Sequence, residues 1–369
     1  MRLGLAGLLG IMTWGSCGAA IPPVQTVFVI VMENHNWSEI KDSTNAPYIN
    51  DTLLPQASFC AQYYNPPGLH PSEPNYLWLE AGTNFGILDD LNPSSNHQAT
   101  TNHLVTLLDQ VGISWRAYQE DISGACVPLI PTNGYTPRHN PFVYFDDVTG
   151  TNNPNWAYGI AHIRPYGELS SDLTNGTMAR YNFITPTLCH DMHDACWPVG
   201  NAIRQGDNWL ASAVPKILDS PAYQDGGALF ITWDESESGD GPIGMLLLSP
   251  LARGGGYCST NHYTHSSLLR TLQELFGVTP LLGDAANAAS LTDLFKCAPL
   301  NTVEKLSDGC FRLAATGLTP GTTNIVEASP DLLHWTAVGT NLTSGDSLAF
   351  VDHAATNFSA RFYRVVRMP

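Results

Sequence analysis

The stretch TVFVIVMENHN, Thr26 to Asn36, decides the fold of this chain. Its residues Val27–Met32 are all apolar, and a polar group that begins with Glu33 and Asn34 follows at once. A continuous, Val-rich apolar run is typical of a strand that is covered on both faces of a parallel sheet. The stretch therefore predicts a buried strand that ends directly in side chains able to bind a ligand.

Strands and helices alternate over most of the chain. We expect further strands at Ile113–Tyr118, Ala228–Trp233 and Gly244–Ser249, and helices at His103–Val111 and Ser266–Phe276. The second helix has Ser at its start and Gly277 directly after it, which are common helix start and stop signals. This alternation predicts an α/β fold with a mostly parallel central sheet flanked by helices.

The pattern changes near the C-terminus. From Gly309 onward, short alternating runs such as NIVEAS and SLAFVD are separated by Pro-Gly and Ser-Gly-Asp turns. Such a pattern predicts a small all-β domain of the sandwich type. We therefore expect a main domain over residues 21–300 and a C-terminal β-sandwich-like domain over residues 305–369.

The composition of the chain limits the classes of molecule that the protein can bind. The chain has 369 residues, of which 43% are hydrophobic and 13% charged, and this is enough for a large core. The formal net charge of -17 disfavours nucleic acid and anionic membranes as partners. Beyond the N-terminus we find no segment long and apolar enough for a stable membrane insertion.

The N-terminus has the pattern of an export signal. Arg2 precedes the apolar run Leu3–Trp14, and the small residues Gly18-Ala19-Ala20 form a cleavage site. We expect a signal peptide over residues 1–20 and a secreted or periplasmic protein. The alternative, a lipid attached to Cys17, fits poorly with Trp14 three residues before it.

Export makes disulfides available to the chain. It has 8 cysteines, and seven remain once Cys17 leaves with the signal peptide. An odd number leaves at least one cysteine unpaired within the chain. Cys189 and Cys196 bracket a short loop and form the first pair that we would test.

Two predicted strands end in oxygen ligands, Glu33-Asn34 and Asp234-Glu235. In parallel α/β sheets, ligands bind beyond the carboxyl ends of the strands. Carboxylate and amide oxygens suit a divalent metal ion such as Ca, Mg or Mn, and Zn remains an option. The alternative is that these residues only cap strands and start turns.

The segment GLHPSEPNYLWLEAG, Gly68–Gly82, carries a candidate nucleophile. Ser72 lies just before Pro74, and Pro is favoured in the first turn of a helix. A helix N-terminus binds anions, and a hydroxyl beside a metal can attack phosphorus. The alternative is an ordinary capping serine.

Two further segments are rich in histidine. CHDMHDAC, Cys189–Cys196, holds two His and two Asp, and NHYTHSS, Asn261–Ser267, places His262 and His265 at a predicted helix start. A histidine there can protonate a leaving alkoxide or bind phosphate oxygens. A surface loop and packed histidines are the alternatives.

Five motifs, VMENHNW, HPSEPNY, DMHD, ALFITWDE and YTHSSLLRTLQELFG, occur in this order. From about Val24 to Phe295 the chain is similar to the phosphoesterase family of acid phosphatases and bacterial phospholipases C, within the alkaline-phosphatase-like superfamily. The resemblance implies an alkaline-phosphatase-like sheet and makes residues 21–300 a phosphoesterase catalytic domain. HPSEPNY resembles the acid phosphatase branch in particular.

The resemblance also implies roles for single residues. The implied metal ligands are Glu33, Asn34, Asp234, Glu235 and the nucleophile Ser72. The implied catalytic residues are Ser72, His265, His193 and Asp194, and we assign His70, Asn75, Asp191 and His262 to substrate binding. The family usually has Asn where this chain has His190.

We therefore expect a secreted, metal-dependent phosphoesterase that hydrolyses small phosphate monoesters in two steps through a phosphoserine. The runner-up is a phospholipase C or another phosphodiesterase, which should have an apolar rim around its pocket. A third hypothesis is a non-catalytic secreted binding protein that uses the β domain for adhesion.

Overall fold

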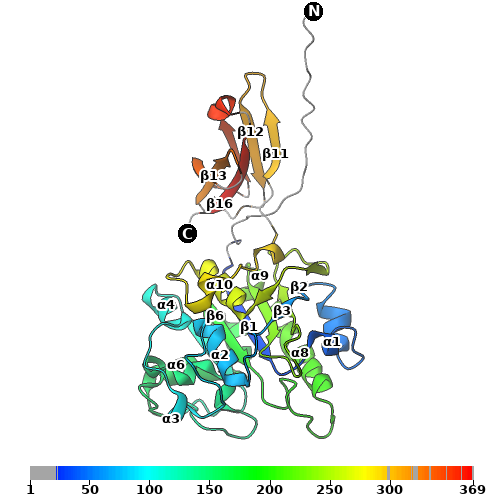
Figure 1. The fold of residues 1–369 in the computed structure, drawn as a ribbon, viewed down its shortest axis with the longest axis vertical. Coiled ribbons are helices and arrows are strands. Elements are labelled where there is room, and N and C mark those ends of the chain that lie inside the picture. The colour runs from blue at the N-terminus through cyan, green and yellow to red at the C-terminus, as the bar shows by residue number, and fades with distance from the viewer. Residues whose placement is uncertain are drawn as a thin grey trace, which may run out of the picture.

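The computed structural model describes residues 22, 24–296, 300–316, 318, 323–331, 334–345, 347–358 and 360–367. The predicted signal peptide, with Cys17 and the expected mature start at Ile21, lies outside the described residues. Figure 1 shows the arrangement of the described helices and strands.

A sheet of eight strands forms the centre of the fold. Its spatial order is β5 (Ile163–Pro165), β4 (Trp115–Gln119), β6 (Tyr181–Thr185), β1 (Val27–Met32), β7 (Ala228–Trp233), β8 (Met245–Leu248), β2 (Ser58–Cys60) and β9 (Tyr257–Ser259). All six residues of β1 and of β7 are buried, as the apolar runs predict. The central position of β1 explains why its sequence has no polar face.

The strands are mostly parallel, and β8 is the exception. β1 pairs in parallel with β6 and β7, and β4 pairs in parallel with β5 and β6. β8 runs antiparallel to both β7 and β2, which agrees with a sheet predicted to be mostly, and not entirely, parallel. The chain between β7 and β8 carries no crossover helix, and a parallel connection needs one.

Helices surround the sheet. They are α1 (Trp37–Ile40), α2 (Ser72–Ala81), α3 (Pro93–Asn96), α4 (Leu104–Gln110), α5 (Asp146–Thr149), α6 (Ala157–His162), α7 (Leu169–Asn175), α8 (Ala202–Leu218), α9 (Pro221–Gln224) and α10 (His265–Phe276). Outside the main sheet, β3 (Tyr63–Tyr64) pairs with β10 (Tyr263–Thr264). The predicted helices near residues 104 and 266 are confirmed as α4 and α10.

The two faces of the sheet carry different helices. The ring of Phe183 contacts α2 and the ring of Tyr181 contacts α10, and these two residues of β6 point to the same face. Met32 of β1 points to the other face, where it adjoins Gly206 of α8. Helices therefore cover both faces, as expected of a parallel α/β sheet.

The C-terminal strands form two antiparallel sheets. One contains β11 (Leu300–Lys305), β12 (Phe311–Thr316) and β15 (Ser347–Asp352), and the other contains β14 (Thr336–Leu342), β13 (Thr323–Ser329) and β16 (Phe362–Arg367). Leu313 and Leu348 of the first sheet share a hydrophobic cluster with Val326 of the second. The sequence prediction of an all-β region with packed sheets is confirmed for these described strands.

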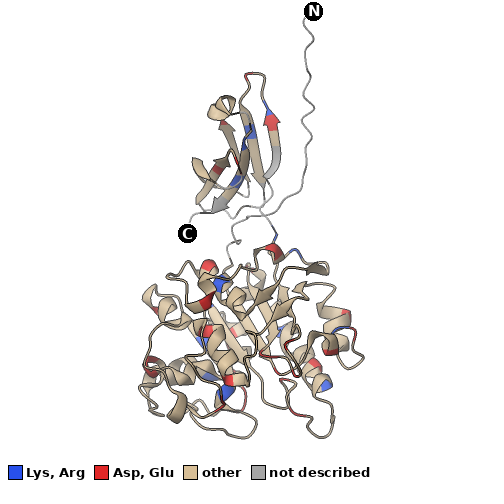
Figure 2. Cartoon of the chain, in the orientation of Figure 1, with Lys and Arg blue, Asp and Glu red and all other residues tan. Residues whose placement is uncertain are grey.

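Figure 2 shows acidic residues distributed over both the α/β part and the C-terminal strands. Among the described residues, no helix combines the length and the apolar character that a membrane crossing requires.

Candidate active site

Two neighbouring strands deliver their terminal carboxylates to one point. Met32 at the end of β1 pairs with Trp233 at the end of β7 in parallel register. Glu33 and Asp234 therefore leave the sheet side by side, and both are fully buried. The backbone N–H of Asn34 donates to Oδ1 of Asp234 at 3.1 Å, which joins the two strand ends directly.

Helix α2 brings a hydroxyl to each oxygen of Glu33. Ser72 is the first residue of α2 and is 2% exposed, and its hydroxyl donates to Oε2 of Glu33 at 3.1 Å. Tyr76, one helical turn later on the same side of the helix, donates to Oε1. The predicted position of Ser72 at the N-terminus of a helix is confirmed.

A third loop and a short 3-10 helix complete the cluster. Asp191 lies in the loop that follows β6. His139 is the last residue of the 3-10 helix Pro137–His139. The His139 Nε2 atom lies 3.3 Å from Oε2 of Glu33, and its Nδ1 atom lies 3.3 Å from Oδ2 of Asp191. The imidazole thus lies between two buried carboxyl groups. Its face stacks on the Tyr76 ring, with the ring centroids 5.2 Å apart.

The cluster is electrostatically costly without a cation. Burial raises the pKa of Glu33, and the carboxylates of Asp234 and Asp191 raise it further. Burial also raises the pKa values of Asp191 and Asp234. Burial holds the pKa of His139 well below its usual range, so this ring is neutral near pH 7 and does not offset the charge.

Several atoms of this cluster fit a metal ion. Oδ2 of Asp191, Oδ2 of Asp234 and Nε2 of His139 are buried and have no hydrogen-bond partner. One terminal atom of the Asn34 amide lies 3.3 Å from Oε2 of Glu33 and 3.1 Å from Oδ1 of Asp234. Placed as nitrogen, this atom donates to both carboxylates, whereas placed as oxygen it adds a third acceptor that a cation would stabilise. Glu33, His139 and Asp191 also offer ligand atoms that all lie within 4.8 Å of one another.

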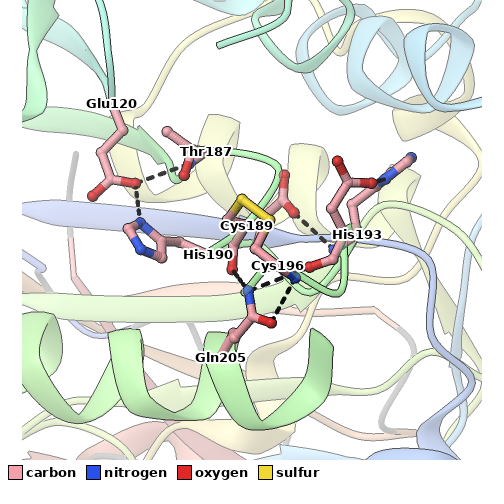
Figure 3. Close-up of a disulfide and its surroundings, with 9 residues drawn as sticks. Glu120, Thr187, Cys189, His190, His193, Cys196 and Gln205 are labelled. Atoms are coloured by element: carbon pink, nitrogen blue, oxygen red, sulfur yellow. Dashed lines mark hydrogen bonds and ion pairs between the residues drawn. A yellow bond between two sulfur atoms is a disulfide. The ribbon is translucent and has the colours of Figure 1, made fainter. Parts of the chain in front are cut away.

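A disulfide shapes the loop that carries Asp191. The predicted pair Cys189–Cys196 is confirmed, and Figure 3 shows the surroundings of this disulfide. Gln205 of α8 fixes the loop, because its amide donates to the Cys189 carbonyl at 2.8 Å and accepts from the Cys196 N–H at 2.8 Å. His190 turns away toward Glu120, with Nδ1 at 2.8 Å from the carboxylate.

His193 has the geometry of an acid–base residue. Its Nδ1 atom lies 2.7 Å from Oδ1 of Asp194, which orients the ring. Its Nε2 atom lies 3.5 Å from Nη2 of Arg138, so both side chains face the same space. His193 is partly exposed, and its backbone N–H donates to Asp191 at 2.8 Å, which ties it to the buried cluster.

Glu235 forms a separate contact next to the cluster. Its Oε2 atom lies 2.5 Å from Nδ1 of His70 and accepts from the Asn75 amide at 3.2 Å. Burial raises its pKa to about 9, with a further contribution from Asp234. In this conformation the described contacts of Glu235 place it with the predicted substrate-binding residues His70 and Asn75, and its role as a metal ligand stays a prediction.

His265 contacts the backbone of Asp234 and the Tyr63 hydroxyl. It is fully buried, its Nε2 atom lies 2.6 Å from the carbonyl oxygen of Asp234, and its Nδ1 atom lies 3.1 Å from the Tyr63 hydroxyl. Burial lowers its pKa to about 4. A neutral ring with both nitrogens engaged holds the backbone of Asp234 in place, which differs from the predicted contact with phosphate.

The other histidine of this motif is at the surface. His262 is exposed and stacks on Tyr64 with ring centroids 4.7 Å apart. None of its described contacts joins it to Glu33, Ser72 or Asp234. Its predicted part in substrate binding therefore gains no support from this conformation.

Sequence reasoning missed His139, Arg138 and Tyr76. Tyr76 carried a usable signal, because it lies four residues after Ser72 and must share its helix face. His139 and Arg138 stand between two prolines in TPRHNPF, a pattern that marks a rigid turn but names no ligand. Their role becomes visible only when the fold brings residues 33, 139 and 191 together.

Comparisons with known proteins relate the chain to phosphatases and to a phospholipase C. The phosphatidylinositol-3-phosphatase of Mycobacterium tuberculosis is 29% identical over 282 residues, which cover 76% of this chain and 86% of that protein. The acid phosphatase of Aspergillus niger is 30% identical over 58% of this chain and 50% of its own length. The non-hemolytic phospholipase C of Burkholderia pseudomallei is 25% identical over 46% of this chain and 31% of its own length.

Among solved structures, a protein in the alkaline phosphatase superfamily from Vibrio parahaemolyticus matches with a TM-score of 0.46 and 12% identity, covering 88% of this chain and 84% of that one. This TM-score is too low to support a conclusion about the present chain.

The class that these relatives define is that of hydrolases acting on phosphoric ester bonds. A model of the Phosphoesterase family matches residues 43–279, which is more than half of the chain. The chain belongs to the Phosphoesterase family, and the predicted resemblance is confirmed.

Proposed function

We propose that this protein is a metal-dependent phosphatase that hydrolyses phosphate monoesters through Ser72. The observation that carries the proposal is the position of the Ser72 hydroxyl, 3.1 Å from Glu33 at the N-terminus of α2 and within the cluster of buried carboxylates. Ser72 does not cap the helix, because Pro71 is the N-cap residue and the Ser72 hydroxyl donates to Glu33 instead. It is placed where an activated nucleophile and a helix N-terminus can act on the same phosphate.

The metal-binding residues in this proposal are Glu33, Asn34, Asp234, Asp191 and His139. Their buried atoms without hydrogen-bond partners and their raised carboxyl pKa values support a bound cation. A divalent cation, when bound, supplies positive charge that favours ionisation of the Ser72 hydroxyl and offsets the charge of phosphate oxygens. The donor set of oxygens with one imidazole accepts several divalent ions, and we do not assign one.

The protein's own groups then account for the remaining chemistry. Ser72 passes its hydroxyl proton to Oε2 of Glu33, the acceptor of its hydrogen bond, and attacks phosphorus, while the ester oxygen departs as the P–O bond to the alcohol breaks. His193, oriented by Asp194, donates a proton to that oxygen, and the same ring afterwards accepts a proton from the water that hydrolyses the phosphoserine. Arg138 faces this space and stabilises phosphate oxygens, while His265 positions the backbone of Asp234.

A phospholipid substrate is the second candidate, and one observation favours it. Trp197 is 92% exposed and Val199 is 46% exposed, directly after the disulfide loop that carries His193. Exposed apolar side chains that follow the loop with His193 are what a lipid-directed enzyme would use at its surface. Parallel assays with p-nitrophenyl phosphate and phosphatidylcholine separate the two candidates.

We also propose that the protein acts outside the cytoplasm. The disulfide in the catalytic loop supports this, because structural disulfides persist mainly in oxidising compartments.

The test of the proposed function is Ser72→Ala. We expect this variant to lose p-nitrophenyl phosphate hydrolysis by roughly 10⁴-fold or more, because nucleophile and acid–base groups act as one unit. The control is Ser220→Ala, which alters another buried serine at the start of a helix, α9, outside the proposed site. Circular dichroism of both variants reports folding. Full turnover in a folded Ser72→Ala variant would refute the proposal.

A further inference from the structure

A second group of metal-ligand atoms lies close to the proposed active site but shares no residue with it. His35 Nδ1, Glu39 Oε2 and Glu237 Oε2 all lie within 4.8 Å of one another. His35 and Glu237 follow β1 and β7, as Glu33 and Asp234 do, and Glu39 belongs to α1. The proposed function uses none of these three side chains.

The His35 ring has a defined orientation. It is 9% exposed, and its Nε2 atom lies 3.2 Å from the carbonyl oxygen of Met192. A carbonyl oxygen only accepts hydrogen bonds, so Nε2 carries the hydrogen of the neutral ring. The lone pair then lies on Nδ1, which is buried and has no hydrogen-bond partner. This lone pair points toward two carboxylates, an arrangement that is repulsive unless a proton or a metal cation lies between them.

The distances fit coordination better than hydrogen bonding. His35 Nδ1 lies 3.5 Å from Oε2 of Glu39 and 3.4 Å from Oε2 of Glu237, beyond the usual N–H···O range of about 2.7–3.2 Å. In a tetrahedral zinc site with bonds of about 2.0–2.2 Å, two ligand atoms are separated by about 3.3–3.6 Å. Both measured separations fall in that range.

The surroundings hold the ligands in place. The Asn36 backbone N–H donates to Oε2 of Glu39 at 2.8 Å, so the carboxylate that faces His35 is fixed. The Asn36 side chain donates to the Ser238 carbonyl at 3.0 Å, which joins the loop after β1 to the loop that carries Glu237. A histidine whose second nitrogen donates to a backbone carbonyl is the usual arrangement of a metal-binding imidazole.

We propose that His35, Glu39 and Glu237 bind a second metal ion, Zn²⁺, in a site that does not contact the substrate. One imidazole nitrogen and two carboxylates form a donor set that zinc favours over the oxygen-seeking Ca²⁺ and Mg²⁺. The ion would join the loops after β1 and β7, and through Met192 it would also fix the disulfide loop. These three loops carry Glu33, Asp234 and Asp191, so the site would act as a positioning element for the active site.

The experiment compares zinc stoichiometry in three full-length proteins. Wild type, Glu237→Gln and Glu304→Gln are stripped with chelator, dialysed against micromolar zinc chloride and analysed for zinc and protein. Glu304 is the matched control, because its side chain is 62% exposed against 58% for Glu237, and it lies in β11. Neither substitution removes a buried group, so both variants should fold.

We expect Glu237→Gln to bind one zinc ion fewer per chain than wild type, and Glu304→Gln to match wild type. Zinc should also raise the melting temperature less in Glu237→Gln than in the other two proteins. If wild type and Glu237→Gln bind the same number of zinc ions, the proposal is overturned. His35 would then form ion pairs with the two carboxylates and bind no metal. The result is independent of the proposed catalytic site, because loss of that site would lower all three counts and leave the difference unchanged.

Discussion

At the scale of single residues, buried histidines stabilise this site in their neutral form. His139 bridges Glu33 and Asp191, and His265 holds the carbonyl oxygen of Asp234. Burial lowers the pKa of both rings, which keeps them uncharged at neutral pH. A neutral ring offers one donor and one acceptor, and His265 uses both, toward Asp234 and Tyr63. Acid should therefore weaken these contacts, because protonation of a ring removes its acceptor nitrogen.

His265 gives a prediction with a defined sign. Its pKa is about 4 in the folded protein and near its ordinary value of 6.5 when unfolded, so the unfolded chain binds more protons between these values. The stabilisation is complete above pH 6.5 and is lost as the pH falls toward 4. We expect wild type to lose about 2 kcal/mol of unfolding free energy from this residue between pH 7 and pH 5.

Urea unfolding at pH 7 and pH 5 measures this effect. The stability difference between wild type and His265→Gln should shrink at pH 5, because Gln does not titrate. His334→Gln, at a ring that is 85% exposed, is the control for the replacement of a histidine by Gln. A His265→Gln variant with the same pH dependence as wild type would contradict the expectation.

Sequence predicted the residues whose position depends on strand register. Glu33 and Asp234 each follow a buried apolar run, and parallel strands end at the same edge of a sheet, so the pattern predicts their shared edge, while the structure shows that β1 and β7 are neighbours. The position of His139 could not be predicted, because it depends on how a proline-bounded turn packs over the sheet. The sequence also could not predict that His265 is neutral and uses both ring nitrogens in hydrogen bonds, since a motif does not show which of its residues are buried.

At the scale of elements, the sequence patterns were accurate where local signals and tertiary packing agree. The strand Ala228–Trp233 was predicted with its observed bounds, because a continuous apolar run between polar residues has one interpretation. The antiparallel direction of β8 was not predicted, because strand direction depends on the connection and not on the strand's own residues. The sequence pattern therefore predicts which segments form strands more reliably than it predicts how those strands pair.

The disulfide loop, residues 189–196, is the element with the clearest energetic consequence. Its two cysteines are separated by seven positions, and closure of so short a loop removes chain entropy worth about 2.5 kcal/mol in the entropic model. The loop carries Asp191, His193 and Asp194, so we expect its release to impair the site as well as the fold. Cys189→Ser/Cys196→Ser should unfold about 2–3 kcal/mol more easily and show a lower kcat.

A reductant provides the matching measurement on wild type. Treatment with a phosphine reductant should lower the kcat of wild type toward that of the double-serine variant and have no effect on the variant itself. Cys258→Ser, which replaces an exposed free cysteine, should respond to the reductant as wild type does. Unchanged kcat after verified reduction of the Cys189–Cys196 bond would mean that Gln205 alone holds the loop.

At the scale of the whole molecule, the described residues form two separate hydrophobic clusters. The large one extends from Val24 to Phe295, and the small one lies between the two C-terminal sheets. All groups of the proposed active site come from residues 33–265. The C-terminal strands should therefore contribute neither to the chemistry nor to the core around it.

Truncation after Lys296 tests this division. Phe295 is buried in the large cluster and Lys296 donates its N–H to the Leu251 carbonyl, so this cut keeps the α/β core whole. We expect unchanged kcat/KM for p-nitrophenyl phosphate and an unchanged melting temperature of the α/β part. The contrasting cut after Ser290 also removes Leu291, Leu294 and Phe295, each at most 1% exposed. Loss of such side chains costs about 2–5 kcal/mol apiece, so the shorter protein should lose both stability and activity. If the cut after Lys296 is as damaging as the cut after Ser290, the C-terminal sheets are part of the catalytic unit.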